Sequence, residues 1–303
     1  MALYLKYRPT ELEDVKGNIE IVSILEKMLN APEEFPHAIL LAGGTGCGKT
    51  TIGRIIANRL GCVGSDFIEV DAGQMRGIDT IREIRQNSSF RPAEGKCRVW
   101  LLDEFHKSTN DAQNAILKIL EDTPKHVYFI ICTTEPNKLI SAVLGRLQRF
   151  DVKPLNESQM YGLLRKVVKE EGQSLSKEIY DQIILDSLGH SRNALQILEK
   201  VLNCPEDKRL EIAKQSAEQQ NQVIDLCRAL LRKAKWKEVN SILVGLKGVD
   251  PEEIRRAVLG YCQAILLKEE NDMAAHIMEN YIEPFYNSGF PGLTLATYSI
   301  IKL

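Results

Sequence analysis

The chain has 303 residues, of which 44% are hydrophobic and 26% charged, and its formal net charge is −2. This length fits two or three compact units, and the nearly neutral charge gives no global sign of a nucleic-acid partner, so a basic surface would have to be local. No apolar stretch reaches membrane-spanning length, the N-terminal MALYLKYRP does not read as a signal peptide, and the seven cysteines are odd in number and scattered without a C-x-x-C pair. These features argue against a disulfide framework and a zinc site, and they predict a cytoplasmic protein, or an intracellular one in an infected host if the gene is carried by a phage.

Residues 38–150 alternate between strand and helix patterns. The expected strands are AILLA (38–42), FIEVDA (67–72), CRVWLLDE (97–104) and VYFIICTT (127–134), and the helical segment TIGRIIANRL follows the first of them after a glycine-rich turn. The strands are almost continuously apolar, which is typical of strands covered on both faces in a parallel sheet. The pattern predicts an α/β domain with a doubly wound parallel sheet.

The character changes after Val152, where strand signals end. Asn156 with Gln159 three residues later predicts a helix start, and SRNALQILEKVL (191–202) carries a helical apolar stripe. A break at NCPED (203–207) separates this segment from a further helical region.

In that last region, Asp250, Pro251 and Glu253 together predict a capped helix start. The pattern therefore predicts a division into an α/β domain over residues 1–153, a small helical domain over 154–207 and an all-helical C-terminal domain over 208–303.

The segment GGTGCGKT (43–50) matches the G-x4-G-K-[ST] phosphate-binding loop and lies between a strand and a helix, as that motif requires. Its glycines allow backbone N–H groups to surround phosphate oxygens at the positive end of the helix dipole. We expect Lys49 to reach the β- and γ-phosphates of ATP and the Thr50 hydroxyl to be a ligand of Mg²⁺. The expected nucleotide contacts in this segment are Gly43, Gly44, Thr45, Gly46, Cys47, Gly48, Lys49, Thr50 and Thr51.

A pair of acids ends the strand VWLLDE. Asp103 is the second expected magnesium ligand, and Glu104 beside it can accept a proton from an attacking water. An Asp-Glu pair at a strand end is more often a solvated terminus, but its position downstream of a P-loop favours catalysis. For His106, an ordinary polar residue on a loop is at least as good an interpretation as a functional role.

Several segments together resemble AAA+ ATPases, specifically the clamp-loader subunits of DNA replication. KYRPTELEDVKGN (6–18) looks like the segment that these subunits place against adenine, and GHSRNALQILEK (189–200) looks like their second sensor. HAILLAGGTGCGKTT, DAQNAILKILEDTP (111–124) and FIICTTEPNKLISAVLGRLQRF (129–150) are similar, in order and spacing, to the gamma/tau subunit family of bacterial DNA polymerase III. The likeness covers about residues 6–205.

The resemblance implies roles for further residues. Tyr7, Arg8 and Val15 would contact the adenine end of ATP, and Thr134 would be the first sensor, close to the γ-phosphate. Arg192 would be the second sensor, and Arg146 would reach the ATP of a neighbouring subunit. Arginine suits both positions because its planar, permanently charged fork pairs with phosphate oxygens.

Two departures from the family are visible. Gly145 and Leu147 flank Arg146 where the family usually has Ser-Arg-Cys, and a local carboxylate could instead pair with this arginine. The four-cysteine zinc module of the bacterial subunits has no counterpart, so the expected cofactors are ATP and Mg²⁺ without zinc.

DNA contacts are expected on RGIDTIREIRQ (76–86). Arg82 and Arg85 share one helical face and Arg76 precedes them, and in clamp loaders the corresponding helix follows the DNA backbone. A solvated helix face is an equally good interpretation. Phe90 and Pro92 are candidates for a contact with the clamp, or for core packing.

The combined expectation is an ATPase subunit of a sliding-clamp loader. Its partners would be the clamp, primer–template DNA and the other subunits of a homo- or hetero-oligomeric ring, which the C-terminal helical collar would hold together. A different AAA+ DNA-associated motor, such as a branch-migration motor or a helicase loader, is the alternative. A scaffold subunit that does not hydrolyse ATP is disfavoured by the intact Lys49, Thr50, Asp103 and Glu104.

Overall fold

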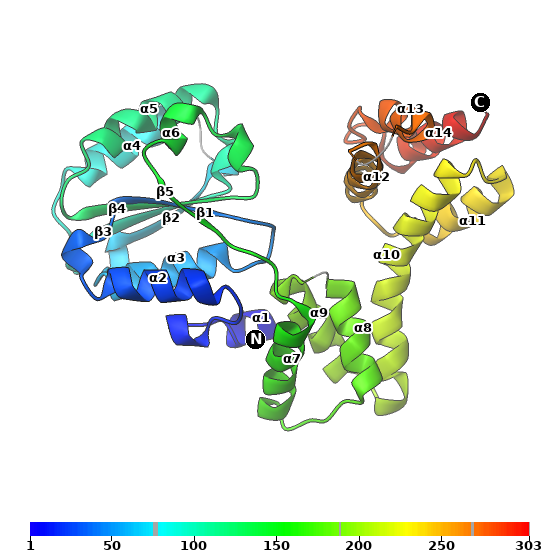
Figure 1. The fold of residues 1–303 in the computed structure, drawn as a ribbon, viewed down its shortest axis with the longest axis horizontal. Helices are drawn as coiled ribbons and strands as arrows, with labels where there is room; N and C mark the ends of the chain where they lie inside the picture. Colours follow the sequence, from blue (N-terminus) through cyan, green and yellow to red (C-terminus); the bar gives the residue numbers. More distant parts are fainter. Residues whose placement is uncertain (75–77, 188, 268–269, 303) are drawn as a thin grey trace. The chain divides into compact units, whose positions relative to one another are not determined.

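The computed structural model describes residues 1–74, 78–187, 189–267 and 270–302. These residues form two compact units, Met1–Asn203 and Cys204–Leu303. Figure 1 shows the part of the chain that contains strands β1–β5 (residues 38–151), followed by the helical parts, which contain α7–α14 (residues 157–302). Each unit is described separately.

The first unit is built on a five-stranded parallel sheet with the order β2-β3-β4-β1-β5. The strands are β1 (Ala38–Ala42), β2 (Phe67–Asp71), β3 (Arg98–Asp103), β4 (Val127–Thr133) and β5 (Gln148–Asp151). Four of them coincide with the predicted strands, which confirms the α/β class. The edge strand β5 was not predicted.

Helices cover both faces of this sheet (Figure 1). One face carries α2 (Ile19–Leu29) and α3 (Lys49–Arg59), and the other carries α4 (Ile78–Ser88), α5 (Asn110–Glu121) and α6 (Ser141–Leu144). Successive strand residues alternate between the two cores: Ile39 and Leu41 pack toward α2 and α3, and Leu40 packs on the opposite face.

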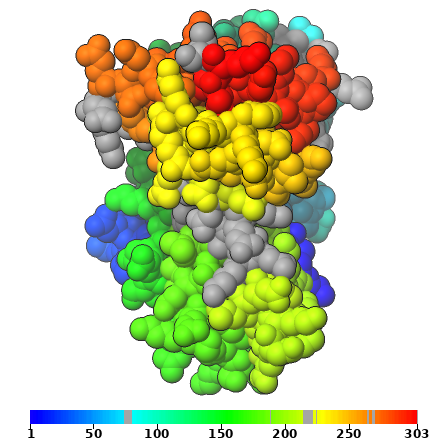
Figure 2. Space-filling model, turned by 90° about the vertical axis from the view of Figure 1, so that its right-hand side faces the viewer, coloured from blue at the N-terminus to red at the C-terminus, as the bar shows by residue number. Residues whose placement is uncertain are grey.

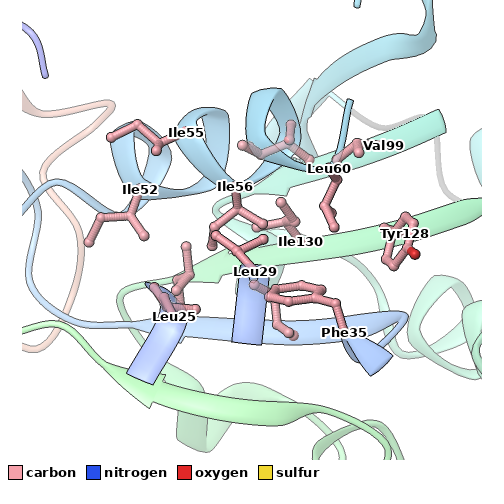
Figure 3. Close-up of a cluster of buried hydrophobic side chains, with 14 of the residues drawn as sticks. Leu25, Leu29, Phe35, Ile52, Ile55, Ile56, Leu60, Val99, Tyr128 and Ile130 are labelled. Atoms are coloured by element: carbon pink, nitrogen blue, oxygen red, sulfur yellow. The ribbon is translucent and has the colours of Figure 1, made fainter. Parts of the chain in front are cut away.

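Figure 3 shows the core that supports the first of these helical layers. Ile52, Ile55 and Ile56 of α3 gather with Leu25 and Leu29 of α2 beside the sheet. Full burial of one such aliphatic side chain contributes about 1.5–3 kcal/mol. This packing fixes α3, whose first residue is Lys49, and thereby fixes the loop that precedes it.

The rest of the first unit is helical, with α1 (Leu3–Lys6) at the N-terminus and α7 (Glu157–Glu170), α8 (Lys177–Ser187) and α9 (Ser191–Leu202) after the sheet. The predicted start at Asn156 is confirmed, because the Asn156 side chain accepts from the backbone N–H of Gln159 while the Gln159 side chain accepts from that of Asn156. Helix α9 packs against α1, α7 and α8.

The second unit consists of α10 (Arg209–Leu231), α11 (Trp236–Gly245), α12 (Pro251–Leu266), α13 (Asp272–Tyr281) and α14 (Gly289–Lys302) around its own apolar core. Figure 2 shows α11 (yellow) and α14 (red) at the surface of this unit. The predicted start of α12 is confirmed, but the Asp250 side chain accepts from the backbone N–H of Glu252, while the N–H of Glu253 donates to the Asp250 carbonyl oxygen. Within the described parts of both units, no helix combines the length and apolarity needed to cross a bilayer.

Candidate nucleotide-binding site

A pocket of about 290 Å³ lies in the first unit, between the N-terminal segment, the loop before α3, the end of β3 and helices α7 and α9. Its volume is at the lower end of the range of small-molecule sites. Most of the predicted nucleotide contacts line it, together with the predicted magnesium ligand Asp103 and the predicted base Glu104. These nucleotide contacts are Tyr7, Arg8, Val15, Thr45, Gly46, Cys47, Gly48, Lys49, Thr50, Thr51 and Arg192. The sequence motifs therefore converge on one cavity.

The loop between β1 and α3 has the backbone that its glycines predict. Gly48 has φ 99°, which is the left-handed region that disfavours other residues. At Gly43 an added Cβ atom would lie 2.1 Å from the carbonyl oxygen of Val152, so only glycine fits against that strand end. Gly43 and Gly44 are not among the described residues that line the pocket.

The Lys49 side chain is buried and held by the loop itself. Its ammonium group donates to the carbonyl oxygens of Gly43 and Gly44, both at 3.0 Å. Because an ammonium has three donors, these two bonds hold the charge in the loop and still allow it to face a bound phosphate. This geometry agrees with the predicted phosphate contact.

The two predicted magnesium ligands touch each other across the pocket. The Thr50 hydroxyl donates to Oδ2 of Asp103 at 2.9 Å, and Oδ1 of Asp103 accepts from the backbone N–H of Glu104. A hydroxyl and a carboxylate oxygen at one point are the hard oxygen donors that Mg²⁺ prefers alongside phosphates and water. The residues present therefore fit the ion.

Glu104 adopts the left-handed backbone conformation, with φ 51°. An L-residue held there is strained by roughly 1–2 kcal/mol. Its carboxylate lies between the pocket and the end of β4, where the Thr134 hydroxyl donates to Oε2 at 3.4 Å. The structure thus brings the predicted first sensor to the predicted base, although Thr134 does not itself line the pocket.

His106 belongs to this group, which sequence reasoning did not establish. Its side chain is only 7% exposed, and Nε2 lies 3.5 Å from Oε2 of Glu104. Nδ1 lies 3.1 Å from the Thr133 hydroxyl, at the buried end of β4. The one available signal was its position two residues after the acidic pair.

The N-terminal segment forms one wall of the pocket. Arg8 donates through Nε to the Thr51 hydroxyl at 3.2 Å, and the Tyr7 hydroxyl donates to Glu171 at 2.6 Å. Burial, followed by the nearby charges of Arg54 and Arg192, lowers the pKa of Arg8. Cationic groups that converge in this way fit a polyanionic ligand such as the triphosphate of ATP.

Helix α9 closes the pocket on another side. The Ser191 hydroxyl donates to the carbonyl oxygen of Gly46 at 3.2 Å, and the Arg192 guanidinium lies 6.0 Å from the centre of the Tyr4 ring. The start of α9, where the second sensor was predicted, therefore lies directly on the phosphate-binding loop.

Arg146 lies elsewhere. Its guanidinium pairs with Glu121 and donates to the carbonyl oxygen of Ala142 at 2.9 Å, and 37% of its side chain is exposed. It is not among the described residues that line the pocket. In the single chain, Arg146 thus pairs with a local carboxylate, which was one of the two possibilities that the sequence allowed.

The residues predicted to contact DNA are only partly described. Arg82 and Arg85 lie on the exposed face of α4, opposite the buried Ile81 and Ile84. Arg76 lies outside the described residues.

Phe90 is 65% exposed, which rules out core packing for its side chain. Its carbonyl oxygen accepts from Nη1 of Arg98 at 3.4 Å and from Nε2 of His126 at 3.0 Å. The backbone is therefore held while the aromatic ring stays in solvent.

Protein-family models match two overlapping parts of the chain: that of the DNA polymerase III delta subunit over residues 64–156, and that of zeta toxin over residues 23–96, which include the phosphate-binding loop. The fold resembles the RuvB Holliday junction branch migration motor of Thermotoga maritima, with a TM-score of 0.58 and 19% identity over 70% of this chain and 72% of that one. At that identity the likeness shows the fold alone.

The sequence resembles curated relatives more closely. It is 33% identical over 225 residues to DNA polymerase III subunit gamma/tau of Mycobacterium bovis, covering 67% of this chain and 39% of that protein. It is also 33% identical to the tau subunit of Bacillus subtilis, with the same coverage, and 31% identical to the gamma subunit of Buchnera aphidicola, covering 60% of that protein. The chain thus spans about two fifths of the Mycobacterium and Bacillus relatives. The motifs, the fold and these matches agree, and the chain belongs to the gamma/tau-like family of AAA+ proteins of the DNA polymerase III clamp loader.

Proposed function

We propose that this chain binds ATP with Mg²⁺ and hydrolyses it to open a sliding clamp and load it onto primer–template DNA. The observation that carries the proposal is the contact of Thr50 with Asp103 in the pocket, beside the carboxylate of Glu104. Phosphoryl transfer needs groups that hold the metal ion, a group that positions or deprotonates the attacking water, and a lysine on the phosphates, and Lys49 lines the same pocket.

Each residue then has a defined task. Lys49 and the loop N–H groups hold the phosphates, and Thr50 with Asp103 would hold Mg²⁺, which neutralises charge on the β- and γ-phosphates. Glu104 accepts the proton of the attacking water, a contribution of about 10²–10⁴ in rate. Arg192 contacts the phosphates from the lid formed by α7–α9, and Thr134 holds the base.

Clamp and DNA are proposed as partners because the sequence likeness is to gamma/tau subunits. Phe90 offers an exposed aromatic side chain on a held backbone, which suits an apolar contact with the clamp. Arg82 and Arg85 offer positive charge for phosphates of the DNA backbone without regard to sequence.

Arg146 is proposed to act on the ATP of the neighbouring subunit in a ring. It lies outside its own pocket, and an exposed ion pair such as that with Glu121 is worth only about 0–1 kcal/mol, so a neighbouring phosphate can replace the carboxylate. An arginine finger contributes about 10³–10⁵ in rate. Hydrolysis would then depend on correct assembly.

The test uses single variants first. Lys49→Ala abolishes ATP binding, whereas Glu104→Gln keeps binding and loses turnover. Normal turnover in Glu104→Gln overturns the assignment of the base.

A mixture then tests the action in trans. Glu104→Gln and Arg146→Ala are each inactive, but a mixed assembly places an intact Glu104 beside a subunit with an intact Arg146, so activity partly returns. Arg149→Ala is the matched control, because Arg149 is also an exposed arginine paired with a carboxylate, that of Asp151. We expect the Arg149→Ala variant to hydrolyse ATP without any mixing partner. A mixture that assembles and binds ATP but stays inactive refutes the trans role of Arg146.

A further inference from the structure

A small network around the buried side chains of His106 and Thr133 lies next to Glu104, at the ends of β3 and β4. It joins His106 to the Thr133 hydroxyl through Nδ1 at 3.1 Å, and to two carboxylates through Nε2: Glu104 at 3.5 Å and Glu135 at 3.4 Å. The imidazole is 7% exposed, so these groups, rather than water, are its main partners.

The groups around the ring define which nitrogen carries the proton. Nε2 faces the carboxylates of Glu104 and Glu135, which only accept, so Nε2 carries the proton. Nδ1 then accepts from the Thr133 hydroxyl, whose oxygen in turn accepts from the backbone N–H of Glu135 at 3.1 Å. A neutral imidazole that accepts at Nδ1 must donate at Nε2. Burial lowers the pKa of His106 despite the raising effect of Glu104 and Glu135, and Lys138 and Lys107 lower it further, which favours this neutral form.

The single Nε2–H therefore faces two carboxylates. Glu135 has a second partner, because Lys138 donates to it at 2.8 and 3.0 Å. Among the described residues, the Glu104 carboxylate has only the long contact from Thr134 besides that of His106, and both donors meet the same oxygen, Oε2. Both contacts hold Oε2 of Glu104, a residue that lines the pocket, and leave Oε1 for a ligand there.

We propose that His106 is a positioning residue for hydrolysis: its Nε2–H, fixed by the Thr133 hydroxyl, holds the Glu104 carboxylate in the orientation that accepts the proton of the attacking water. This inference rests on the proposed function. The present contacts are long for hydrogen bonds, as is common for catalytic groups before the substrate binds. His106 does not line the pocket, so its effect is on turnover and not on nucleotide binding.

Two amide substitutions separate the roles of the two ring nitrogens. The glutamine amide of His106→Gln reaches the place of Nε2 and can donate to Glu104, whereas the shorter amide of His106→Asn reaches only the place of Nδ1. His106→Ala and His106→Asn lower kcat about 10- to 100-fold with an unchanged Kd for ATP, while His106→Gln keeps most of the turnover. In a Glu104→Gln background, His106→Ala adds no further loss.

The matched control is His37→Gln, a histidine at the opposite end of the sheet that contacts the carbonyl oxygen of Val127, and its turnover stays normal. If His106→Ala does not fold, Thr133→Val tests the same inference, because valine keeps the shape of the buried threonine side chain and lacks only its hydroxyl. We expect Thr133→Val to lower kcat and to bind ATP normally. Wild-type kcat in His106→Ala or Thr133→Val, equal losses in the Gln and Ala variants, or a loss expressed in ATP affinity overturns the inference. If the wild-type chain in its reconstituted loader does not hydrolyse ATP at all, the proposed function itself fails.

Discussion

Asp66 provides the sharpest test of how the first unit is held together. Its side chain is fully buried, and each carboxylate oxygen accepts two hydrogen bonds. Oδ1 accepts from the backbone N–H of Ala93 at 2.9 Å and from Nη2 of Arg98 at 3.0 Å, and Oδ2 accepts from the N–H groups of Glu94 at 2.8 Å and Gly95 at 2.9 Å. One carboxylate thus anchors the loop that follows Phe90.

Asp66→Asn keeps the shape of the side chain but replaces one acceptor oxygen by an NH₂ donor. In either orientation of the amide, two hydrogen bonds to a charged acceptor are lost. At about 1.5–3 kcal/mol for each, the free energy of unfolding of the first unit falls by about 3–6 kcal/mol. The estimate agrees with the roughly 3–5 kcal/mol lost when one partner of a buried ion pair is removed.

The assay uses the fact that the chain has two tryptophans, one in each unit. In a Trp236→Phe background, the fluorescence of the buried Trp100 in β3 reports urea unfolding of the first unit. Asp181→Asn, at an exposed position on α8, is the control and leaves the midpoint unchanged. A loss below about 1 kcal/mol for Asp66→Asn, the size of an ordinary substitution, refutes the reasoning.

The same variant has a pH signature. Burial raises the pKa of Asp66, but the backbone N–H groups of Glu94, Gly95 and Ala93, with Arg98, outweigh it and hold the pKa well below its usual range. A group with a lowered folded-state pKa stabilises fully above its unfolded value of about 3.9, and that contribution is lost as the pH falls toward the folded value. The stability difference between wild type and Asp66→Asn therefore narrows below about pH 4. A constant difference down to pH 3 contradicts the ionic origin.

Three further variants test the proposed contacts. Replacing Arg82 and Arg85 by Ala lowers DNA-stimulated ATPase activity. It also reduces the slope of log K for DNA binding against log salt concentration by about two, since each phosphate contact contributes about 0.9. An unchanged slope would mean that both residues only form a solvated helix face. Phe90→Ala weakens clamp binding in a pull-down while the urea midpoint stays the same, and equal clamp binding removes this contact from the proposal. Gly43→Ala brings a Cβ atom onto the Val152 carbonyl oxygen and abolishes ATP binding in calorimetry; normal affinity would show that the loop can move aside.

The sequence predicted the parts of the fold that depend on contiguous residues. The phosphate-binding loop is read from one segment because its strand, glycines and helix follow each other without interruption. Strands β1 and β4 are buried at every position, and a continuous apolar run is visible in the sequence. Strand β5 was missed because only Phe150 of its four residues is buried, and its pairing with β1 supplies the rest.

The candidate site was predictable to the same degree. Lys49, Thr50 and Asp103 belong to recognisable motifs, and the structure brings them together. The contacts of His106 come instead from the end of a different strand, so no local pattern reveals them. The bond between Tyr7 and Glu171 joins residues 164 positions apart, and only the folded chain places them together.

That last bond has a mechanical consequence. Tyr7 is bonded to the end of α7, together with Lys6, whereas the next residue, Arg8, is bonded to Thr51 on α3. Two consecutive residues are therefore bonded to two different helices that flank the pocket: Tyr7 to the end of α7, and Arg8 to α3, which follows the phosphate-binding loop. A rotation of α7 away from the sheet must break one bond or twist the peptide between them. The N-terminal segment thus couples two sides of the pocket, because moving α7 away from α3 has to disrupt the hydrogen bonds of Lys6 and Tyr7 or that of Arg8.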